Sequence, residues 1–563
     1  MLAPVDSARA AVVIVAKVRN ISQPAIHNSI ASPLINTFKM AGRTVGELLR
    51  QITPYFLLLL LVSTLGPLQF GYHLAELNAP QSVITCHKTS VLNAVRSAGW
   101  FSNVITRSDK GKHATPHGFF RECIPMSETA FATVSSMFTV GGLFGALAAG
   151  PLASKKGRLS AMAYTSLLFG IGAATETLSN TVLILCLGRL LTGIGAGAST
   201  VVVPLYISEI SPPAERGFFG SMTQVSINVG ILLTQTLGYF LSHGNAWRFI
   251  FVVGTCIAVA QHLGLYLVPE SPAWLAAHGD PARAKRILQR IRGSGCDVHE
   301  ETRHWDLLSG PPSTQDAEEE QQRLLTRTDG AAPTSPPATP AGTARHMGFL
   351  EVIKDAKTRP AIIAVVGIMI TQQFCGINSI IMYSVSLLAN LLPIPSALLT
   401  IIISGVNLVM TMACTPLPDR LGRKTCLLIS IFGQGSSSLA LALSIIYGAK
   451  VVSAVAVLFF VAFFAVGLGP VPFIMASELV GQEAVGATQS WCLAANYIAT
   501  FIVAQFFPLV NTALNKVLGK AGWVYFLFAG LAVLGGIFVS AKVPETKGKS
   551  DADEVWGRTR RLD

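Results

Sequence analysis

The feature that most constrains this chain is a series of about twelve apolar stretches, each near the roughly 20 residues that cross a lipid bilayer. They lie at residues 54–77, 127–149, 160–179, 182–206, 217–241, 247–268, 360–389, 394–415, 425–447, 451–476, 487–511 and 521–543. Charged residues make up only 13% of the chain, about half of their share in a soluble protein. Because the apolar excess extends over nearly the whole sequence, one buried core cannot hold it. The sequence therefore predicts an all-α membrane protein with 12 transmembrane helices.

The basic residues predict how these spans are oriented. Two tight loops between spans carry positive charge, with Lys155, Lys156 and Arg158 in one and Arg420, Arg423 and Lys424 in the other. Short basic loops stay in the cytoplasm, and an even number of spans then places both termini there. The net charge of +12 comes without a basic-aromatic binding motif, so we expect the lipid bilayer as a partner and no nucleic acid.

Spans and polar segments divide the chain into five parts. They are a cytoplasmic N-terminal extension (1–50), an N-terminal six-helix bundle (51–268), a cytoplasmic linker (269–359), a C-terminal six-helix bundle (360–543) and a cytoplasmic tail (544–563). The linker begins with helix-forming sequence at 282–292, and its Pro/Ala/Thr-rich stretch at 330–344 predicts a disordered insert. A long external loop at 79–126 contains Cys86 and Cys123, which could form a disulfide. The cysteines show no metal-ligand spacing, so no metal site is predicted.

Three motifs occur once in each half, in the same order. Residues 150–158 (GPLASKKGR) match 415–423 (TPLPDRLGR), residues 203–209 (VPLYISE) match 471–478 (VPFIMASE), and residues 269–272 (PESP) match 544–547 (PETK). Their nearly constant spacing predicts a parallel duplication of a six-span unit. Such an architecture has its substrate site near the membrane midplane, between the halves, and alternates access by rocking.

These motifs resemble those of the sugar porter family of the major facilitator superfamily, over roughly residues 53–550. Residues 66–81 (GPLQFGYHLAELNAPQ) resemble a fungal, hexose-transporter-like subgroup, and further matches are Gly188-Arg189, 269–275 (PESPAWL), 372–378 (QQFCGIN) and 544–548 (PETKG). The resemblance implies a major facilitator fold of two six-helix bundles with a cytoplasmic helical linker, in a monomer without a cofactor. It also implies alternating-access transport of a hexose such as glucose or fructose, or of a related small polyol. No nucleophile–base set, phosphate loop or metal cluster is recognisable, so we do not expect an enzyme.

The candidate sugar site consists of side-chain amides in apolar spans. A hexose needs groups that both donate and accept hydrogen bonds, and an aromatic surface for its C–H face. The seventh span offers Gln372, Gln373 and Asn378, and buried amides in membrane helices are functional candidates. The resemblance adds these to the substrate-binding set: Gln224, Asn407, Asn496, Phe473 and Tyr497, with Tyr383 at the external gate. For each amide the alternative is a hydrogen bond between helices.

Charged residues recur where the spans meet the cytoplasm. The resemblance implies that they form ion pairs between the two halves, which hold the outward-open state and break for inward opening: Arg158, Glu209, Arg216, Asp419, Arg423 and Glu478. The alternative is that they only set the topology. Ser154, Ala273 and Val485 stand where the family usually has a charge, which predicts a weakened gate.

His73, Glu76 and Arg189 leave the mode of transport open. The resemblance implies that proton-coupled members have Asp where this chain has His73, and that the arginine at the position of Arg189 is the partner of that Asp. One hypothesis is proton symport through Glu76 or His73 with Arg189. A second is facilitated diffusion, with a neutral His73 and with Glu76 in an ion pair of the outer loop. A third is a non-transporting sugar sensor or trafficking-related orphan. The plasma membrane is favoured over the vacuolar membrane.

Overall fold

The computed structural model describes residues 53–86, 121–212, 215–293, 298–306, 349–387, 395–481, 484–519, 521–549 and 552–558. The predicted extension at 1–50, the predicted insert at 330–344 and much of the external loop lie outside these residues. In the described part of the chain every regular element is a helix.

The helices fall into an N-terminal set, a short linker set and a C-terminal set. The first set comprises α3 (Pro54–Ala75), α4 (Gln81–Ile84), α6 (Glu128–Lys156), α7 (Arg158–Thr177), α8 (Val182–Ile210), α9 (Arg216–Leu241) and α10 (Arg248–Leu265). The linker holds α11 (Pro272–Ala277), α12 (Pro281–Arg292), α13 (His299–Asp306) and α15 (Glu351–Lys354). The last set comprises α16 (Arg359–Phe374), α17 (Ile377–Leu387), α18 (Ser396–Cys414), α19 (Leu417–Leu421), α20 (Arg423–Ile446), α21 (Lys450–Val466), α22 (Val471–Glu478), α23 (Val485–Leu518), α24 (Val524–Lys542) and α25 (Ala552–Val555).

The predicted number of spans agrees with these helices. Nine helical segments among the described residues are long and apolar enough to cross a membrane, with α21 and α22 counted as one, and α16 and α17 form a tenth span bent by 42°. The less apolar helices α7 and α9, 20 and 26 residues long, complete twelve. Each predicted span overlaps one of these segments.

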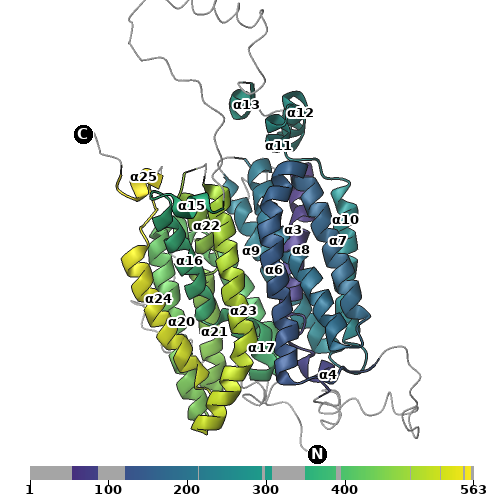
Figure 1. The fold of residues 1–563 in the computed structure, drawn as a ribbon, viewed down its shortest axis with the longest axis vertical. Helices are drawn as coiled ribbons and strands as arrows, with labels where there is room; N and C mark the ends of the chain where they lie inside the picture. The colour runs from purple at the N-terminus through teal and green to yellow at the C-terminus, as the bar shows by residue number, and fades with distance from the viewer. Residues whose placement is uncertain are drawn as a thin grey trace, which may run out of the picture.

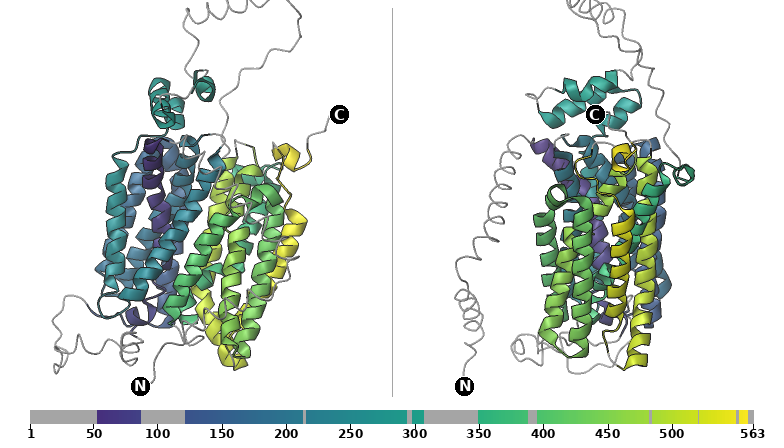
Figure 2. Two further views of the ribbon diagram at one scale, coloured as in Figure 1. Left: turned by 180° about the vertical axis from the view of Figure 1, so that it is seen from behind. Right: turned by 90° about the vertical axis from the view of Figure 1, so that its left-hand side faces the viewer.

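The long helices form two bundles that lie side by side (Figure 1). The N-terminal bundle contains α3 and α6 to α10, and the C-terminal bundle contains α16 to α18 and α20 to α24. Helices α6 and α9 of the first bundle contact α23 and α18 of the second. The linker helices α11 to α13 lie at one end of the N-terminal bundle and α4 lies at the other (Figure 1), and Figure 2 shows the linker helices beyond the same end in two further views. We call these the linker end and the disulfide end.

Small residues let helices inside the N-terminal bundle approach closely. Helices α6 and α8 carry Gly141-x-x-x-Gly145 and Gly193-x-x-x-Gly197. A Cβ added at Gly145 would lie 2.0 Å from the carbonyl oxygen of Ile194. Without a hydrophobic driving force between helices in lipid, such close backbone packing is a main source of helix association.

The internal repeat is visible at the linker end. Arg158 donates from its guanidinium to Glu209 at 2.7 Å and from its backbone N–H to Glu270 at 2.8 Å. Its counterpart Arg423 does the same to Glu478 at 2.9 Å and to Glu545 at 2.8 Å. The three repeated motifs therefore meet in space once in each half, since each supplies one member of these clusters.

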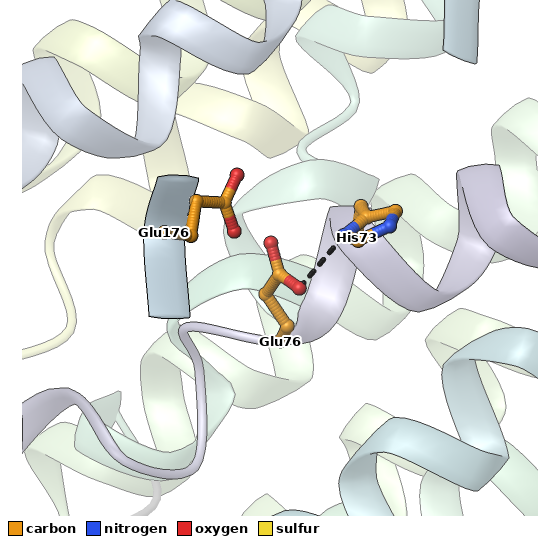
Figure 3. A group of neighbouring side chains, drawn as sticks. All are labelled: His73, Glu76 and Glu176. Atoms are coloured by element: carbon orange, nitrogen blue, oxygen red, sulfur yellow. Dashed lines mark hydrogen bonds and ion pairs between the residues drawn. The ribbon is translucent and has the colours of Figure 1, made fainter. Parts of the chain in front are cut away.

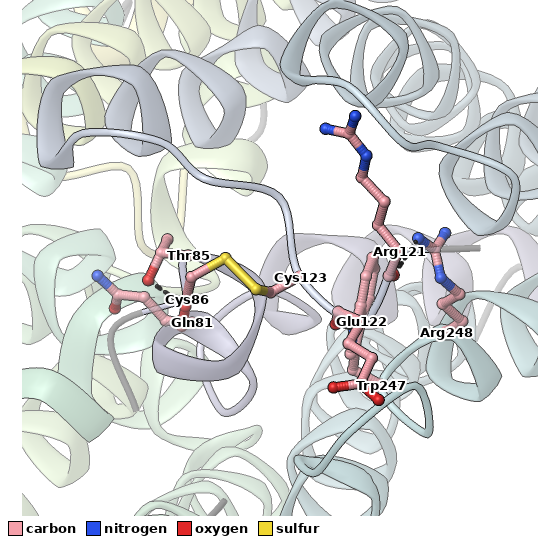
Figure 4. Close-up of a disulfide and its surroundings, with 8 residues drawn as sticks. All are labelled: Gln81, Thr85, Cys86, Arg121, Glu122, Cys123, Trp247 and Arg248. Atoms are coloured by element: carbon pink, nitrogen blue, oxygen red, sulfur yellow. Dashed lines mark hydrogen bonds between the residues drawn. A yellow bond between two sulfur atoms is a disulfide. The ribbon is translucent and has the colours of Figure 1, made fainter. Parts of the chain in front are cut away.

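The disulfide end is held by a covalent bond and by one arginine. Cys86 and Cys123 are bonded to each other (Figure 4). Arg248 at the start of α10 donates to the carbonyl oxygens of Thr177 and Ser179, both at 2.7 Å, and to that of Arg121 at 3.0 Å. These contacts fix the segment that leads into α6 against the ends of α4, α7 and α10.

Candidate functional site

Four of the predicted amides form a continuous hydrogen-bonded ladder in the C-terminal bundle. The side-chain amide of Asn496 donates to Gln372 Oε1 at 2.6 Å, and Gln373 donates to the same oxygen at 2.9 Å. Asn378 donates to Gln373 Oε1 at 2.6 Å and to Thr500 Oγ1 at 3.3 Å. Gln373 and Asn378 are only 4% and 7% exposed, so they do not face lipid.

Two broken helices position this amide ladder. The span of α16 and α17 breaks at Gly376, whose φ of +97° favours glycine, and the break separates Gln373 from Asn378. The span of α21 and α22 breaks around Gly467, and there the carbonyl of Leu468 accepts a hydrogen bond from Gln372 Nε2. Irregular backbone at membrane depth occurs where it is buried or lines a cavity, and transporters bind substrates at such discontinuous helices.

A second polar group crosses the interface between the bundles. Asn228 of α9 donates to Thr411 Oγ1 of α18 at 2.7 Å, and its Oδ1 accepts from Asn407 at 3.3 Å. Gln224 contributes a longer bond of 3.4 Å to Asn228. The predicted Gln224 and Asn407 are therefore brought together through a residue that the sequence analysis missed.

Gln235 is another missed amide. It is 1% exposed, lies at a cavity shared with Asn407 and Ser404, and neither of its amide atoms has a hydrogen-bond partner among the described residues. Gln224, Asn228 and Gln235 lie on one face of α9, since they are four and then seven residues apart. That spacing is the sequence signal that could have found both missed residues.

The predicted aromatic residues lie between the bundles or behind the ladder. The hydroxyl of Tyr497 is 3.4 Å from Thr200 Oγ1 of α8, and its ring packs against Gly142 of α6. Phe473 is half-buried in the same apolar cluster as Tyr497. Tyr383 is 2% exposed, donates to the carbonyl of Ala504 at 2.7 Å and packs its ring edge-to-face against Phe131 of α6 at 6.4 Å, so it lies between the bundles.

The gate residues do not pair as the resemblance implied. Arg158 pairs with Glu209 inside the N-terminal bundle, whereas Arg423 pairs with Glu478 and Asp419 inside the C-terminal bundle. The described residues show no ion pair between the halves, and Arg216 is exposed at the start of α9. In this conformation each of these carboxylates pairs with an arginine of its own bundle. The expectation concerned the outward-open state, so pairing between the halves stays a prediction for that state.

The three positions without the usual charge make other contacts. The carbonyl of Ser154 accepts from Trp274 Nε1 at 2.9 Å, and Ala273 packs in the apolar cluster of the linker helices. Val485 begins α23 and packs against the main core.

The bundles are joined by hydrogen bonds toward the disulfide end. Gln505 of α23 accepts from Ser136 of α6 at 2.7 Å and donates to Thr133 at 3.3 Å. Asn78, which follows α3, donates to the carbonyl of Ile381 at 2.9 Å and accepts from the N–H of Val385 at 3.1 Å. These hydrogen bonds hold the two bundles together at the disulfide end, whereas the described residues show no ion pair between the bundles at the linker end.

An ionisable cluster lies inside the N-terminal bundle (Figure 3). His73 Nδ1 is 2.8 Å from Glu76 Oε2, and Arg189 donates to the other oxygen of Glu76 and to the backbone carbonyl of His73. Glu176 of α7 was missed in the sequence analysis; its Oε1 accepts from Thr192 at 2.9 Å. The expectation that Glu76 forms an ion pair in the outer loop is wrong, because Glu76 is 1% exposed and points into the bundle.

The same cluster is the candidate for a metal. Ligand atoms of His73, Glu76 and Glu176 lie within 4.8 Å of one another. The guanidinium of Arg189 already occupies one oxygen of Glu76, and His73 Nδ1 faces the other, so the cluster has few ligand atoms left for a metal ion. We therefore do not assign a metal site here.

Comparisons with known proteins agree with this architecture. The sequence model of the family described as "Sugar (and other) transporter" matches residues 59–554. A probable metabolite transport protein of Saccharomyces cerevisiae, YBR241C, is 33% identical over 508 residues, which cover 90% of this chain and 96% of the relative. Vacuolar protein sorting-associated protein 73 of the same yeast is 30% identical over 88% of this chain and 95% of its own length. The facilitated glucose transporter member 2 of Gallus gallus is 29% identical over 91% and 94%.

Solved structures show the same fold. The xylose transporter XylE of E. coli, in a partially occluded inward-open conformation, matches with a TM-score of 0.64 at 23% identity, over 88% of this chain and 100% of that chain. A second structure, the proton:xylose symporter XylE bound to 6-bromo-6-deoxy-D-glucose, gives 0.63 at 24% identity, over 89% and 98%. With its two six-helix bundles, its buried amide ladder and a family match over most of its length, this chain is an integral membrane protein of the major facilitator superfamily and belongs to the sugar (and other) transporter family.

Proposed function

We propose that this chain carries a hexose, of the glucose or fructose type, across a membrane by alternating access. The observation that carries the proposal is the amide ladder of Gln372, Gln373, Asn378 and Asn496, buried at two helix breaks. In the absence of sugar these amides satisfy one another, which removes the penalty of burying them. Sugar hydroxyls donate and accept like the amides they replace, so binding exchanges one set of hydrogen bonds for another. The names of the chicken and E. coli relatives support a monosaccharide as substrate.

The test is uptake of labelled glucose, fructose, xylose and inositol by cells that lack their own hexose transporters. Gln373→Ala removes one rung of the ladder, and we expect kcat/KM for the preferred sugar to fall about tenfold to a hundredfold, since a hydrogen bond and a newly unpaired amide are involved. The matched control is Gln261→Ala, which removes an equally buried amide of α10 that accepts from Gln69 inside the N-terminal bundle. An equal effect of both substitutions on kcat/KM would contradict the assignment of the ladder as the sugar site.

A second candidate is a sugar sensor or trafficking protein that does not transport. It is favoured by Ser154, Ala273 and Val485 at positions of usual charge, and by the name of the yeast relative associated with vacuolar protein sorting. Purified chain that binds glucose but gives no flux in liposomes would establish this candidate. Transport remains our proposal because hydrogen bonds between the two bundles close the disulfide end. Such bonds can break and let this end open.

We further propose that the linker end faces the cytoplasm, which places both termini there, and that the chain resides in the plasma membrane. The basic residues Lys155, Lys156, Arg420 and Lys424 at the linker end support this orientation. The disulfide at the opposite end supports an oxidising compartment there. Imaging of a fluorescently tagged chain distinguishes the plasma membrane from the vacuolar membrane, which the name of the second yeast relative favours.

A further inference from the structure

The break in the span of α21 and α22 is supported by the neighbouring helix α20. A broken helix frees backbone N–H and C=O groups, which need other partners inside a membrane protein. Gly467 at the break lies so close to α20 that an added Cβ would meet the carbonyl oxygen of Cys426. There the hydroxyl of Ser430 donates to the carbonyl of Phe463 at 2.7 Å and accepts from the N–H of Leu468 at 3.0 Å. One serine of α20 therefore caps the backbone on both sides of the break.

A buried amide fixes this hydroxyl. Gln434, one turn further along α20, donates from Nε2 to Ser430 Oγ at 3.2 Å, and both residues are 0% exposed. A hydroxyl has one proton and can accept two hydrogen bonds. The two backbone groups and Gln434 together fill every bonding position of Ser430, so the hydroxyl has a single orientation.

Gln434 makes this one hydrogen bond and leaves the rest of its amide unsatisfied. Its Oε1 is buried and has no donor among the described residues. A buried polar atom without a partner destabilises a protein, and an apolar side chain of similar size would not have this effect. A half-satisfied amide inside a helix bundle indicates that its hydrogen bond has a role other than stability.

The hydrogen bonds continue from the break to the amide ladder. The carbonyl of Leu468, whose N–H is held by Ser430, accepts from Gln372 Nε2. That bond orients the amide of Gln372, whose Oε1 is the shared acceptor of two other ladder amides. A chain of hydrogen bonds therefore runs from Gln434 through the break to the centre of the ladder.

The N-terminal half has a different arrangement at the equivalent place. Helices α7 and α20 are counterparts, because they begin at the repeated arginines Arg158 and Arg423. Thr165 and Phe169 of α7 stand at the positions of this serine and glutamine, and the Thr165 hydroxyl donates within its own helix at 2.7 Å. The counterpart of the broken span is α8, which is continuous over Val182–Ile210. The serine and glutamine thus accompany the helix break and are not a requirement of the repeated fold.

We propose that Ser430 and Gln434 are positioning residues of the sugar site. They fix the backbone at the break, and the break fixes the amide of Gln372 before the sugar arrives. A site whose groups are already oriented binds more tightly, because less ordering remains to be done on binding. The inference rests on the proposed function, because the site that these residues position is the proposed sugar site.

The test compares sugar affinity with stability in the purified full chain. Binding of labelled D-glucose and of labelled D-fructose gives Kd, and thermal unfolding of the same samples gives Tm. We expect Ser430→Ala to raise Kd about tenfold or more and Gln434→Leu to raise it about 2- to 12-fold, which is the effect of one hydrogen bond. Gln434→Leu should keep or raise Tm, because it removes the unpartnered Oε1. A residue with a merely structural role would lower Tm and leave Kd unchanged.

Ser444→Ala is the matched control, because it removes another buried serine hydroxyl between the same two helices. Ser444 of α20 is 5% exposed and lies 2.8 Å from Ser453 of α21, toward the disulfide end and away from the break. It should lower Tm and leave Kd as in the wild type. The double variant of Ser430→Ala and Gln434→Leu should bind no more weakly than Ser430→Ala, since both act through one hydroxyl.

Each other outcome overturns a defined statement. If Gln372→Ala weakens binding while Ser430→Ala and Gln434→Leu do not, the positioning role is refuted and the sugar site stands. If the wild type binds neither sugar, the proposed hexose function is refuted as well. An equal rise of Kd in Ser444→Ala would mean that any loosening between α20 and α21 weakens binding, which also refutes the positioning role. If Ser430→Ala does not fold, Gln434→Leu decides alone, and an unchanged Kd in that variant refutes the proposal.

Discussion

Substitution of Asn78 by alanine tests whether the disulfide end is held closed by one amide. Asn78 follows α3 in the N-terminal half, and its side chain makes two hydrogen bonds to the backbone of α17 in the C-terminal half, at 2.9 and 3.1 Å. Both bonds cross between the bundles, so they exist only when the disulfide end is closed. Asn78→Ala removes both and leaves the packing of each bundle unchanged.

The magnitude follows from the number of bonds. Each hydrogen bond contributes about 0.5–1.5 kcal/mol net, so two contribute about 1–3 kcal/mol to the closed state. A free energy of that size changes the ratio of closed to open molecules by about 5- to 150-fold. We therefore expect a measurable population that is open at the disulfide end in Asn78→Ala.

The assay is a distance distribution between spin labels at Thr129 of α6 and Ala513 of α23, in a background without the seven cysteines that lie outside the disulfide. Both positions are exposed, and their neighbours Glu128 and Thr512 lie in contact at 3.4 Å. Wild-type protein should give mainly a short distance, and Asn78→Ala should add a longer one.

Two control variants make this distance measurement decisive. Gln505→Ala, which also removes bonds between the bundles, should lengthen the distance in the same way. Thr85→Val removes only a bond within α4 and should change nothing. If Asn78→Ala gives the same spin-label distance as Thr85→Val while Gln505→Ala gives a longer one, the hydrogen bonds of Asn78 to α17 do not hold the disulfide end closed.

Two further predictions concern stability. Gln235→Leu replaces a buried amide whose atoms have no hydrogen-bond partner in the described part of the chain. The substitution should therefore stabilise the sugar-free protein by about 1–3 kcal/mol and weaken sugar binding. Thermal unfolding with and without sugar measures both effects. Gln261→Leu is its control and should destabilise, because Gln261 accepts from Gln69 at 2.5 Å. Cys86→Ser should destabilise by about 2–4 kcal/mol, because the disulfide closes a loop with a sequence separation of 37. A reductant should lower the unfolding temperature of the wild type but not that of Cys86→Ser, and Cys256→Ser, at an exposed free cysteine, should leave it unchanged.

The sequence predicted the spans well, because length and hydropathy alone determine which segments can cross a membrane. It also predicted the repeat, which the paired clusters of Arg158 and Arg423 reproduce. It did not predict which arginine pairs with which carboxylate at the gate, since the pairing depends on the conformation that the bundles adopt. Glu176 was missed for another reason. It is the one carboxylate in α7, and only the neighbours that fold against it show that it lies in a cluster. Gln235 has a signal in the sequence, its spacing from Gln224 and Asn228, but only the fold shows that it lies at a cavity.

The two halves share a framework but not a polar interior, and this difference constrains the mechanism. Both are built on the same cluster at the linker end, whereas ionisable groups lie in the N-terminal bundle and neutral amides in the C-terminal bundle. A neutral sugar exchanges readily with amides, so the C-terminal bundle is the half that suits the proposed substrate. The two interiors are joined by contacts between the halves, among them those of Phe70 and Asn78 on either side of the cluster in sequence. Variants at these contacts should therefore change how fast the bundles move relative to each other, although neither residue is predicted to touch the sugar.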